Sequence, residues 1–361
     1  MVALPSSSSS ARRAPGRYSS SLLAQIVLTF ALFSALLVTT SLAARTKATV
    51  VEGSEAILPM KKHSLYAPYV ESNLQNKYWD FGGDAIVDTN RHVRLTQDKP
   101  HQAGYLWSRT PINNDNYEIE FEFRIDGKAG VTFGDGLALW LTDDRAKTGP
   151  VFGSKDRFRG LGVFFDTYAN ARHPYAFPRV MAMIGDGKTE YNGARDGGGQ
   201  ELGACSIDIR RTRVATKGRL TFVRGVYLEL KIHYKEWDTW EPCFKIEDAQ
   251  VPRNPFLGFS SLTGDVSDAH DIVNVKTSQI VFKNRSHVEL LAERRKHFSP
   301  EAIKSAKAGS DYTTAYRASS FVHGVYHLIV FLVKWGIVVA VLAALVILGL
   351  RYRKKRDVKR F

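Results

Sequence analysis

Short segments in which apolar and polar residues alternate run through the middle of the chain, from Tyr78 to Phe282. The segment 118–124 (EIEFEFR) is the clearest, because its three apolar residues would face one side of a strand and its four charged residues the other. Segments 137–141, 161–165, 179–184, 220–222, 227–234, 243–246 and 279–282 are also typical of strands, and turn residues separate them. We therefore predict an all-β domain in which two antiparallel sheets pack face to face.

The pattern changes after Asn284. Residues 287–297 (HVELLAERRKH) favour a short helix with Val288, Leu291 and Ala292 on its apolar side, and Ser299-Pro300 would end it. No sustained heptad repeat follows, so the sequence does not support a stable coiled-coil oligomer. We interpret residues 285–327 as a stalk.

Two long apolar runs flank the strand-rich region. The first follows a basic, Ser-rich leader and ends in small residues, which is typical of a signal peptide (residues 1–44) cleaved near Ala43, although an uncleaved anchor is an alternative. The second, residues 328–350, would span about 35 Å as a helix, enough to cross a bilayer. The basic segment 351–361 follows it and would lie in the cytosol. The sequence thus predicts a type I membrane protein with a lumenal domain at 45–284, a transmembrane helix and a short cytosolic tail.

The formal net charge of +14 is concentrated at the two ends of the chain. The first 43 residues hold three arginines and no acid, and the last eleven hold seven basic residues and one acid. These charges lie beside the apolar runs, which indicates membrane topology and no nucleic-acid partner. The two cysteines, Cys205 and Cys243, form one disulfide more often than two free thiols in a secretory chain, and they do not make a zinc site.

The segment 160–170 (GLGVFFDTYAN) contains the main candidate chemistry. After an apolar strand it places Asp166 and Asn170 four residues apart, and a turn can point both side chains and the Tyr168 carbonyl at one centre. Calcium prefers such oxygen ligands. Asp135, between two glycines, and Asp196, in a glycine-rich loop, could complete the shell. A solvated turn after a buried strand is the alternative reading of this motif.

The surrounding segments resemble the leguminous-type lectins of the early secretory pathway, the membrane-anchored cargo receptors that cycle between endoplasmic reticulum and Golgi. The matching segments occur in the family's order between roughly residues 55 and 284: WDF at 79–81, RLT at 94–96 with Trp107, GDGLALW at 134–140, PVFGSKD at 150–156, 160–168, and TGDVSD at 263–268. The resemblance implies a concanavalin-like jelly roll and a disulfide between Cys205 and Cys243.

The resemblance also implies roles for individual residues. Asp166, the Tyr168 carbonyl, Asn170 and Asp196 match the family's calcium shell. Asp135 and Asn170 match residues that contact the sugar, and Gly264, Asp265 and Val266 fall where the family offers backbone groups to the ligand.

Three positions depart from the family pattern. Gly193 stands where the family commonly has a histidine that contacts the sugar, and His101 replaces a serine at the rim. Ala171 follows Asn170 where an aspartate is frequent, which argues against a second calcium. His101 could supply the missing ring, although an exposed histidine without a role is the alternative.

These features predict a calcium-dependent lectin, and not an enzyme, that binds high-mannose N-glycans on secretory glycoproteins. It would act as a cargo receptor in the membranes of the endoplasmic reticulum, the intermediate compartment and the Golgi, with vesicle coat proteins binding the tail through its terminal Lys359-Arg360-Phe361. The sequon Asn284-Arg285-Ser286 predicts one N-glycan.

Two other functions stay open. One is a membrane tether of the same fold with weak or lost sugar binding, and the other is a jelly-roll glycoside hydrolase that uses Glu118, Glu120 and Glu122. The acidic loop around His270 is interpreted as a solvated turn, and His173 and His233 belong to no recognisable pattern.

Overall fold

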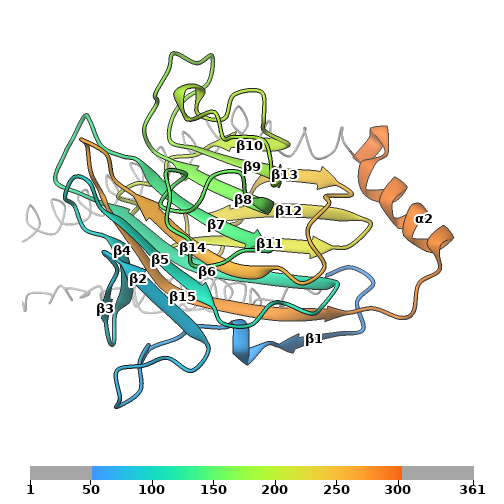
Figure 1. Cartoon of the computed structure of the whole chain (residues 1–361). Helices are drawn as coiled ribbons and strands as arrows, with labels where there is room; N and C mark the ends of the chain where they lie inside the picture. Colours follow the sequence, from blue (N-terminus) through green and yellow to red (C-terminus); the bar gives the residue numbers. More distant parts are fainter. Residues whose placement is uncertain (1–50, 303–361) are drawn as a thin grey trace, which may run out of the picture. The chain divides into compact units, whose positions relative to one another are not determined.

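The computed structural model describes residues 51–302, and its strands form two antiparallel sheets (Figure 1). The eight-stranded sheet has the order β13 (Glu241–Glu247), β12 (Tyr227–His233), β11 (Thr216–Val223), β6 (Asn116–Asp126), β15 (Ala269–Val281), β4 (His92–Thr96) and β3 (Ile86–Asp88), with β1 (Ala56–Pro59) also paired to β15. The seven-stranded sheet has the order β10 (Gly203–Ser206), β9 (Arg179–Asp186), β8 (Arg159–Asp166), β7 (Gly136–Thr142), β14 (Phe256–Leu262), β5 (Ala103–Ser108) and β2 (Trp79–Gly83). The predicted all-β sandwich is confirmed.

The main core lies between the sheets and follows the alternation of the strands. In β6 the residues Ile119, Phe121 and Phe123 are buried, and the phenylalanines meet Phe165 and Phe259 of the other sheet at ring-centroid distances of 5.0–5.8 Å. Such aromatic pairs add to the free energy gained from burial alone.

The charged side chains of β6 occupy its outer face. Glu120 forms an ion pair with Arg219 at 2.8 Å, and Glu122 accepts a hydrogen bond from Asn274 at 3.0 Å. This arrangement is the one expected of a solvated strand face, and it leaves the hydrolase alternative without a specific structural support.

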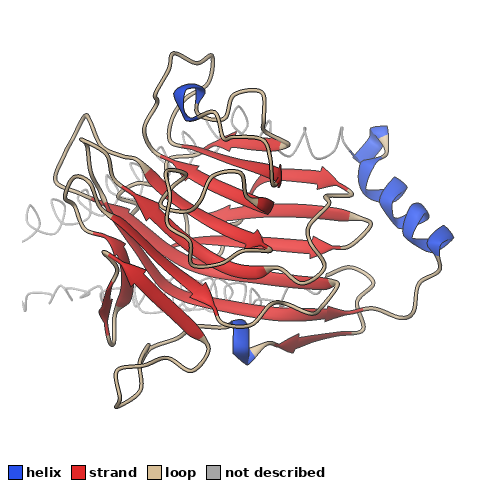
Figure 2. Cartoon of the chain, in the orientation of Figure 1, coloured by secondary structure: helices blue, strands red, loops and turns tan. Residues whose placement is uncertain are grey.

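A second apolar cluster covers the other face of the seven-stranded sheet. All residues of β7 are buried, as are all of β8 except Arg159. In this cluster Trp140 packs against Phe158 and Phe164 packs against Phe152. Phe152 and Phe158 belong to the loop between β7 and β8. The long loop between β7 and β8 (loops are tan in Figure 2) is therefore anchored on the sheet, which explains why the central strands of this sheet have apolar residues on both faces.

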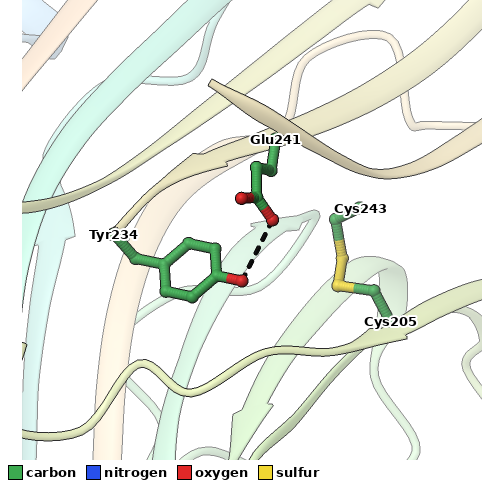
Figure 3. Close-up of a disulfide and its surroundings, with 4 residues drawn as sticks. All are labelled: Cys205, Tyr234, Glu241 and Cys243. Carbon is green, nitrogen blue, oxygen red and sulfur yellow. Dashed lines mark hydrogen bonds between the residues drawn. A yellow bond between two sulfur atoms is a disulfide. The ribbon is translucent and has the colours of Figure 1, made fainter. Parts of the chain in front are cut away.

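The disulfide between Cys205 and Cys243 is present in the structure, as predicted. It joins β10 to β13, which are the edge strands of the two sheets. Figure 3 shows it beside the hydrogen bond that Tyr234 donates to Glu241 at 3.0 Å. The bridge therefore ties one side of the sandwich together.

Two 3-10 turns, η1 (Lys61–His63) and η2 (Gly193–Arg195), and the helix α2 (His287–Phe298) complete the described elements. The helix and its end before Pro300 were predicted, but its packing face was not. Val288 is 74% exposed, whereas Leu290 and Phe298 pack against the cluster of Val223, Val226 and Tyr227. Polar contacts set this rotation of the helix, because Arg294 binds the Gly225 carbonyl at 2.6 Å and the Asp248 carboxylate at 2.9 Å.

The helix and the loop before β7 lie at opposite ends of the eight-stranded sheet. Val223, in the cluster that α2 covers, pairs with Asn116 at the start of β6, whereas the loop 127–135 follows Asp126 at the end of β6. Figure 1 shows α2 at the right of the molecule and this loop region at the left.

Within residues 51–302, no helix has the length and apolar character needed to cross a membrane. The predicted signal peptide (1–44), transmembrane helix (328–350) and cytosolic tail (351–361) lie outside the described residues, as does most of the predicted stalk.

Candidate functional site

The candidate site begins where β7 and β8 meet at one end of their sheet. Asp135 immediately precedes β7, and Asp166 is the last residue of β8, opposite Gly136. The amide of Thr167 donates to the Asp135 carbonyl at 2.9 Å, so the pairing continues past the strands. Both carboxylates are thus held by rigid β-structure.

A pocket of about 250 Å³ opens at this point. It contains three of the predicted site residues, Asp135, Asp166 and Asn170, together with the anomalous Gly193. Its remaining lining residues are Pro150, Val151, Phe152, Asp156, Tyr191 and Leu262. The sequence motifs therefore converge on one concave site.

Asp196 is buried beside this pocket and anchors the loop that carries Asn170. Its carboxylate accepts hydrogen bonds from the Asn170 backbone amide at 3.0 Å and from the Asn170 side-chain amide at 2.6 Å. Asp196 itself has a positive φ of 50° at the end of η2, a conformation that aspartate tolerates better than most residues.

His173 also contacts Asp196, which the sequence analysis did not predict. Its Nε2 lies 2.6 Å from the Asp196 carboxylate, and its ring stacks on Tyr175 with centroids 4.6 Å apart. The available signal was its position, because His173 follows Asn170 by three residues in the same loop.

The carboxylates of Asp166 and Asp135 lie in surroundings that disfavour their charged forms. Burial raises the pKa of Asp166 to about 8, and the charge of Asp196 acts in the same direction. Burial also raises the pKa of Asp135 to about 6. A cation between these carboxylates would offset both effects.

The donor set fits calcium. Carboxylate, carbonyl and amide oxygens of Asp166, Tyr168, Asn170 and Asp196 are the hard ligands that Ca²⁺ prefers. Within the described residues, no group of three or more His, Cys, Asp or Glu side chains is arranged to hold a metal ion. The candidate set includes only two carboxylates and is completed by a backbone and an amide oxygen.

The loop 263–268 borders Asp135 from the other side. A Cβ on Gly264 would lie 3.3 Å from Asp135 Oδ2, and Val266 contacts the same turn near Gly134. The His101 amide donates to the Gly264 carbonyl at 3.0 Å, and the His101 ring lies 3.4 Å from the exposed Asp265 carboxylate. His101 therefore contacts the predicted sugar-binding backbone but does not line the pocket.

The acidic segment around His270 is a solvated turn only in part. Asp265 is exposed as predicted, whereas Asp268, His270 and Asp271 are almost completely buried. Arg210 binds Asp268, whereas Arg94 and Arg124 bind Asp271, so the two carboxylates are neutralised by separate guanidinium groups.

Comparisons with known proteins agree with this geometry. The family model described as the legume-like lectin family matches residues 59–287. The chain is 37% identical over 222 residues to the L-type lectin-like domain-containing protein C126.08c of Schizosaccharomyces pombe, covering 61% of this chain and 71% of that protein. It is 32% identical over 314 residues to the human vesicular integral-membrane protein VIP36, covering 86% of this chain and 87% of that one.

Solved structures of the VIP36 lumenal domain are also similar. The form bound to Ca²⁺ and Man2 has a TM-score of 0.60 and 35% identity, covering 64% of this chain and 93% of that one. The form bound to Ca²⁺ and Man3GlcNAc has a TM-score of 0.58 and 33% identity, covering 64% and 96%. The fold, the site and the family match together lead to one conclusion: this chain belongs to the legume-like lectin family, whose members are carbohydrate-binding proteins and not enzymes.

Proposed function

We propose that this chain is a calcium-dependent lectin that binds mannose-type N-glycans on secretory glycoproteins. The observation that carries the proposal is that Asp135, Asp166 and Asn170 line one pocket, with Gly264 next to Asp135 and Asp196 buried behind Asn170. The VIP36 structures bound to Ca²⁺ and mannose ligands support the same assignment.

The residues divide the work between metal and sugar. Asp166, the Tyr168 carbonyl, Asn170 and Asp196 would hold Ca²⁺, whose charge stabilises the buried carboxylates and fixes the loop. Asp135 would accept hydrogen bonds from sugar hydroxyls, and the Gly264–Val266 backbone would supply further polar groups. A few converging polar groups in a shallow pocket suit a neutral sugar.

Gly193 favours one alternative, a membrane tether with weak or lost sugar binding. Without the family histidine the pocket has fewer groups that contact a ligand. The alternative and the lectin differ in one measurable property, which is calcium-dependent retention of glycans.

We also propose that the protein transports glycoproteins between the endoplasmic reticulum and the Golgi as a type I membrane protein. The name of the VIP36 relatives, vesicular integral-membrane protein, supports a location in secretory-pathway membranes. Vesicle coat proteins would bind the tail that ends in Phe361.

A glycan array probed with residues 45–284 tests the lectin function. High-mannose glycans should be retained in calcium and released by a chelator, whereas complex glycans without exposed mannose serve as the internal control. Equal retention with and without calcium would contradict the proposal, and absence of any retention would favour the tether.

A further inference from the structure

A buried arginine lies behind the two loops that carry the candidate sugar contacts. The side chain of Arg210 is 7% exposed and that of its partner Asp268 is fully buried. The guanidinium donates through Nε and Nη2 to both oxygens of Asp268, each at 2.7 Å. Neither residue lines the pocket. A bidentate pair of this kind fixes the orientation of both groups.

The same guanidinium holds the loop 127–134, which leads into Asp135. Nη2 donates to the Ala129 carbonyl at 2.8 Å and lies 3.4 Å from that of Gly127. The guanidinium carbon also lies 3.9 Å from the centroid of the Phe133 ring, within range of a cation–π interaction. Arg210 therefore contacts this loop near its start and near its end.

Asp268 belongs to the second loop, 263–268, which contains Gly264. The two loops approach closely, because a Cβ on Gly127 would lie only 2.2 Å from Asp268 Oδ1. Asp98 provides a further link, since it accepts from the Lys128 amide at 2.8 Å and from the Ser267 hydroxyl at 2.9 Å. Both loops are thus tied to each other away from the pocket.

We propose that Arg210 is a positioning residue for sugar binding: it clamps the loops 127–134 and 263–268 together so that Asp135 and Gly264 face one ligand. The inference rests on the proposed lectin function. Gly264 and the Asp135 carboxylate lie against each other across the two loops, since a Cβ on Gly264 would be 3.3 Å from Asp135 Oδ2. A small displacement of either loop therefore separates groups that must contact the sugar together.

The test compares Arg210→Lys with Arg94→Lys. Arg94 makes a similar bidentate pair with buried Asp271, at 2.7 and 3.0 Å, but within residues 51–302 its side chain donates hydrogen bonds to Asp271 alone. Lysine keeps the charge at both positions and loses the planar fork. Binding of mannobiose to the calcium-loaded lumenal domain is measured by calorimetry, and hydrogen exchange of residues 127–134 is measured without sugar.

Arg210→Lys should weaken mannobiose binding about tenfold or more and accelerate exchange in 127–134, while Arg94→Lys changes neither. Phe133→Leu is a second variant for the case in which Arg210→Lys does not fold. It removes only the contact between the aromatic ring and Arg210, and it should also accelerate exchange in residues 127–134. Unchanged affinity in Arg210→Lys, or equal weakening by Arg94→Lys, would overturn the proposal. If the unmodified domain binds no mannobiose, the lectin function fails, whereas the exchange measurement still decides whether Arg210 clamps the loop.

Discussion

Gly193 has room for the side chain that it lacks. Its φ is not in the positive region that favours glycine, and a Cβ would meet only the Tyr191 ring, at 3.9 Å. This distance is an ordinary van der Waals contact. The backbone conformation therefore does not require glycine at this position, and we expect the missing side chain to affect ligand binding.

Gly193→His should tighten mannose binding by roughly tenfold, because it restores a hydrogen-bonding ring worth about 1–3 kcal/mol beside Asp135 and Asn170. Calorimetry with mannobiose measures the gain, and Gly193→Ala is the control because it adds a Cβ without a ring. Strong binding by the unmodified domain with no gain in Gly193→His would show that another group fills the role. Tyr191 lines the pocket and becomes the first candidate, whereas His101 does not line it.

Asp166→Asn and Asn170→Ala should each abolish the stabilisation of the domain by calcium. A ligand that binds only the folded state at 100 times its Kd adds about 2.7 kcal/mol. Melting temperatures in calcium and in chelator measure it. The matched control is Asp143→Asn, an exposed carboxylate just beyond the other end of β7, paired with Arg159 at 3.4 Å. Identical melting of the unmodified domain in both buffers would rule out the calcium site.

At the scale of elements, the alternation of residues in β6 and the short apolar runs of β7 to β9 were sufficient to predict these strands, and the alternation also gave the inward direction of Phe121 and Phe123. Local patterns were insufficient where contacts between residues distant in sequence determine which side chains are buried. The face of α2 depends on Asp248 and Gly225, and the burial of Asp268 depends on Arg210, 58 residues away. None of these three partners is visible from local periodicity.

The disulfide between β10 and β13 should raise the free energy of unfolding by about 3–4 kcal/mol, because it closes a loop of 38 residues. Replacing both Cys205 and Cys243 by alanine removes the link between the sheet edges. Denaturant unfolding in calcium measures the loss. As a control, the unmodified domain under strong reductant should unfold at the same denaturant midpoint as the double variant. A difference between these two midpoints would mean that the packing of the cysteine side chains contributes more to stability than the covalent bond does.

His270 of β15 should make the domain sensitive to acid. Burial lowers its pKa to about 3, while its Nδ1 lies 2.7 Å from the Thr96 hydroxyl. The unfolded chain, with a pKa near 6.5, therefore takes up a proton first as the pH falls, and the folded state loses about 2 kcal/mol between pH 7 and pH 5.

Comparison with His270→Asn isolates this contribution. The difference in unfolding free energy between the two proteins should shrink from pH 7 to pH 5. A difference that is independent of pH would show that His270 binds protons equally in the folded and unfolded states, so that its pKa is not lowered by folding.

At the scale of the whole molecule, glycosylation of Asn284 tests the proposed orientation of the protein in the membrane. This exposed residue lies between β15 and α2, and Ser286 of its sequon caps the helix by accepting from the Glu289 amide. Under the proposed orientation, microsomes should yield a protein with one endoglycosidase-sensitive glycan, absent in Asn284→Gln, and a tail that protease removes from outside. Protection of the C-terminus in intact microsomes would contradict the type I orientation.

The opposite placement of α2 and the binding loops has a geometric consequence. The ten steps along β6 separate them by about 34 Å at the usual rise of a strand. The chain continues towards the proposed membrane segment from the α2 end, so the pocket lies at the end of the described domain that is remote from this attachment. A glycan bound in the pocket would therefore not contact the helix from which the chain continues.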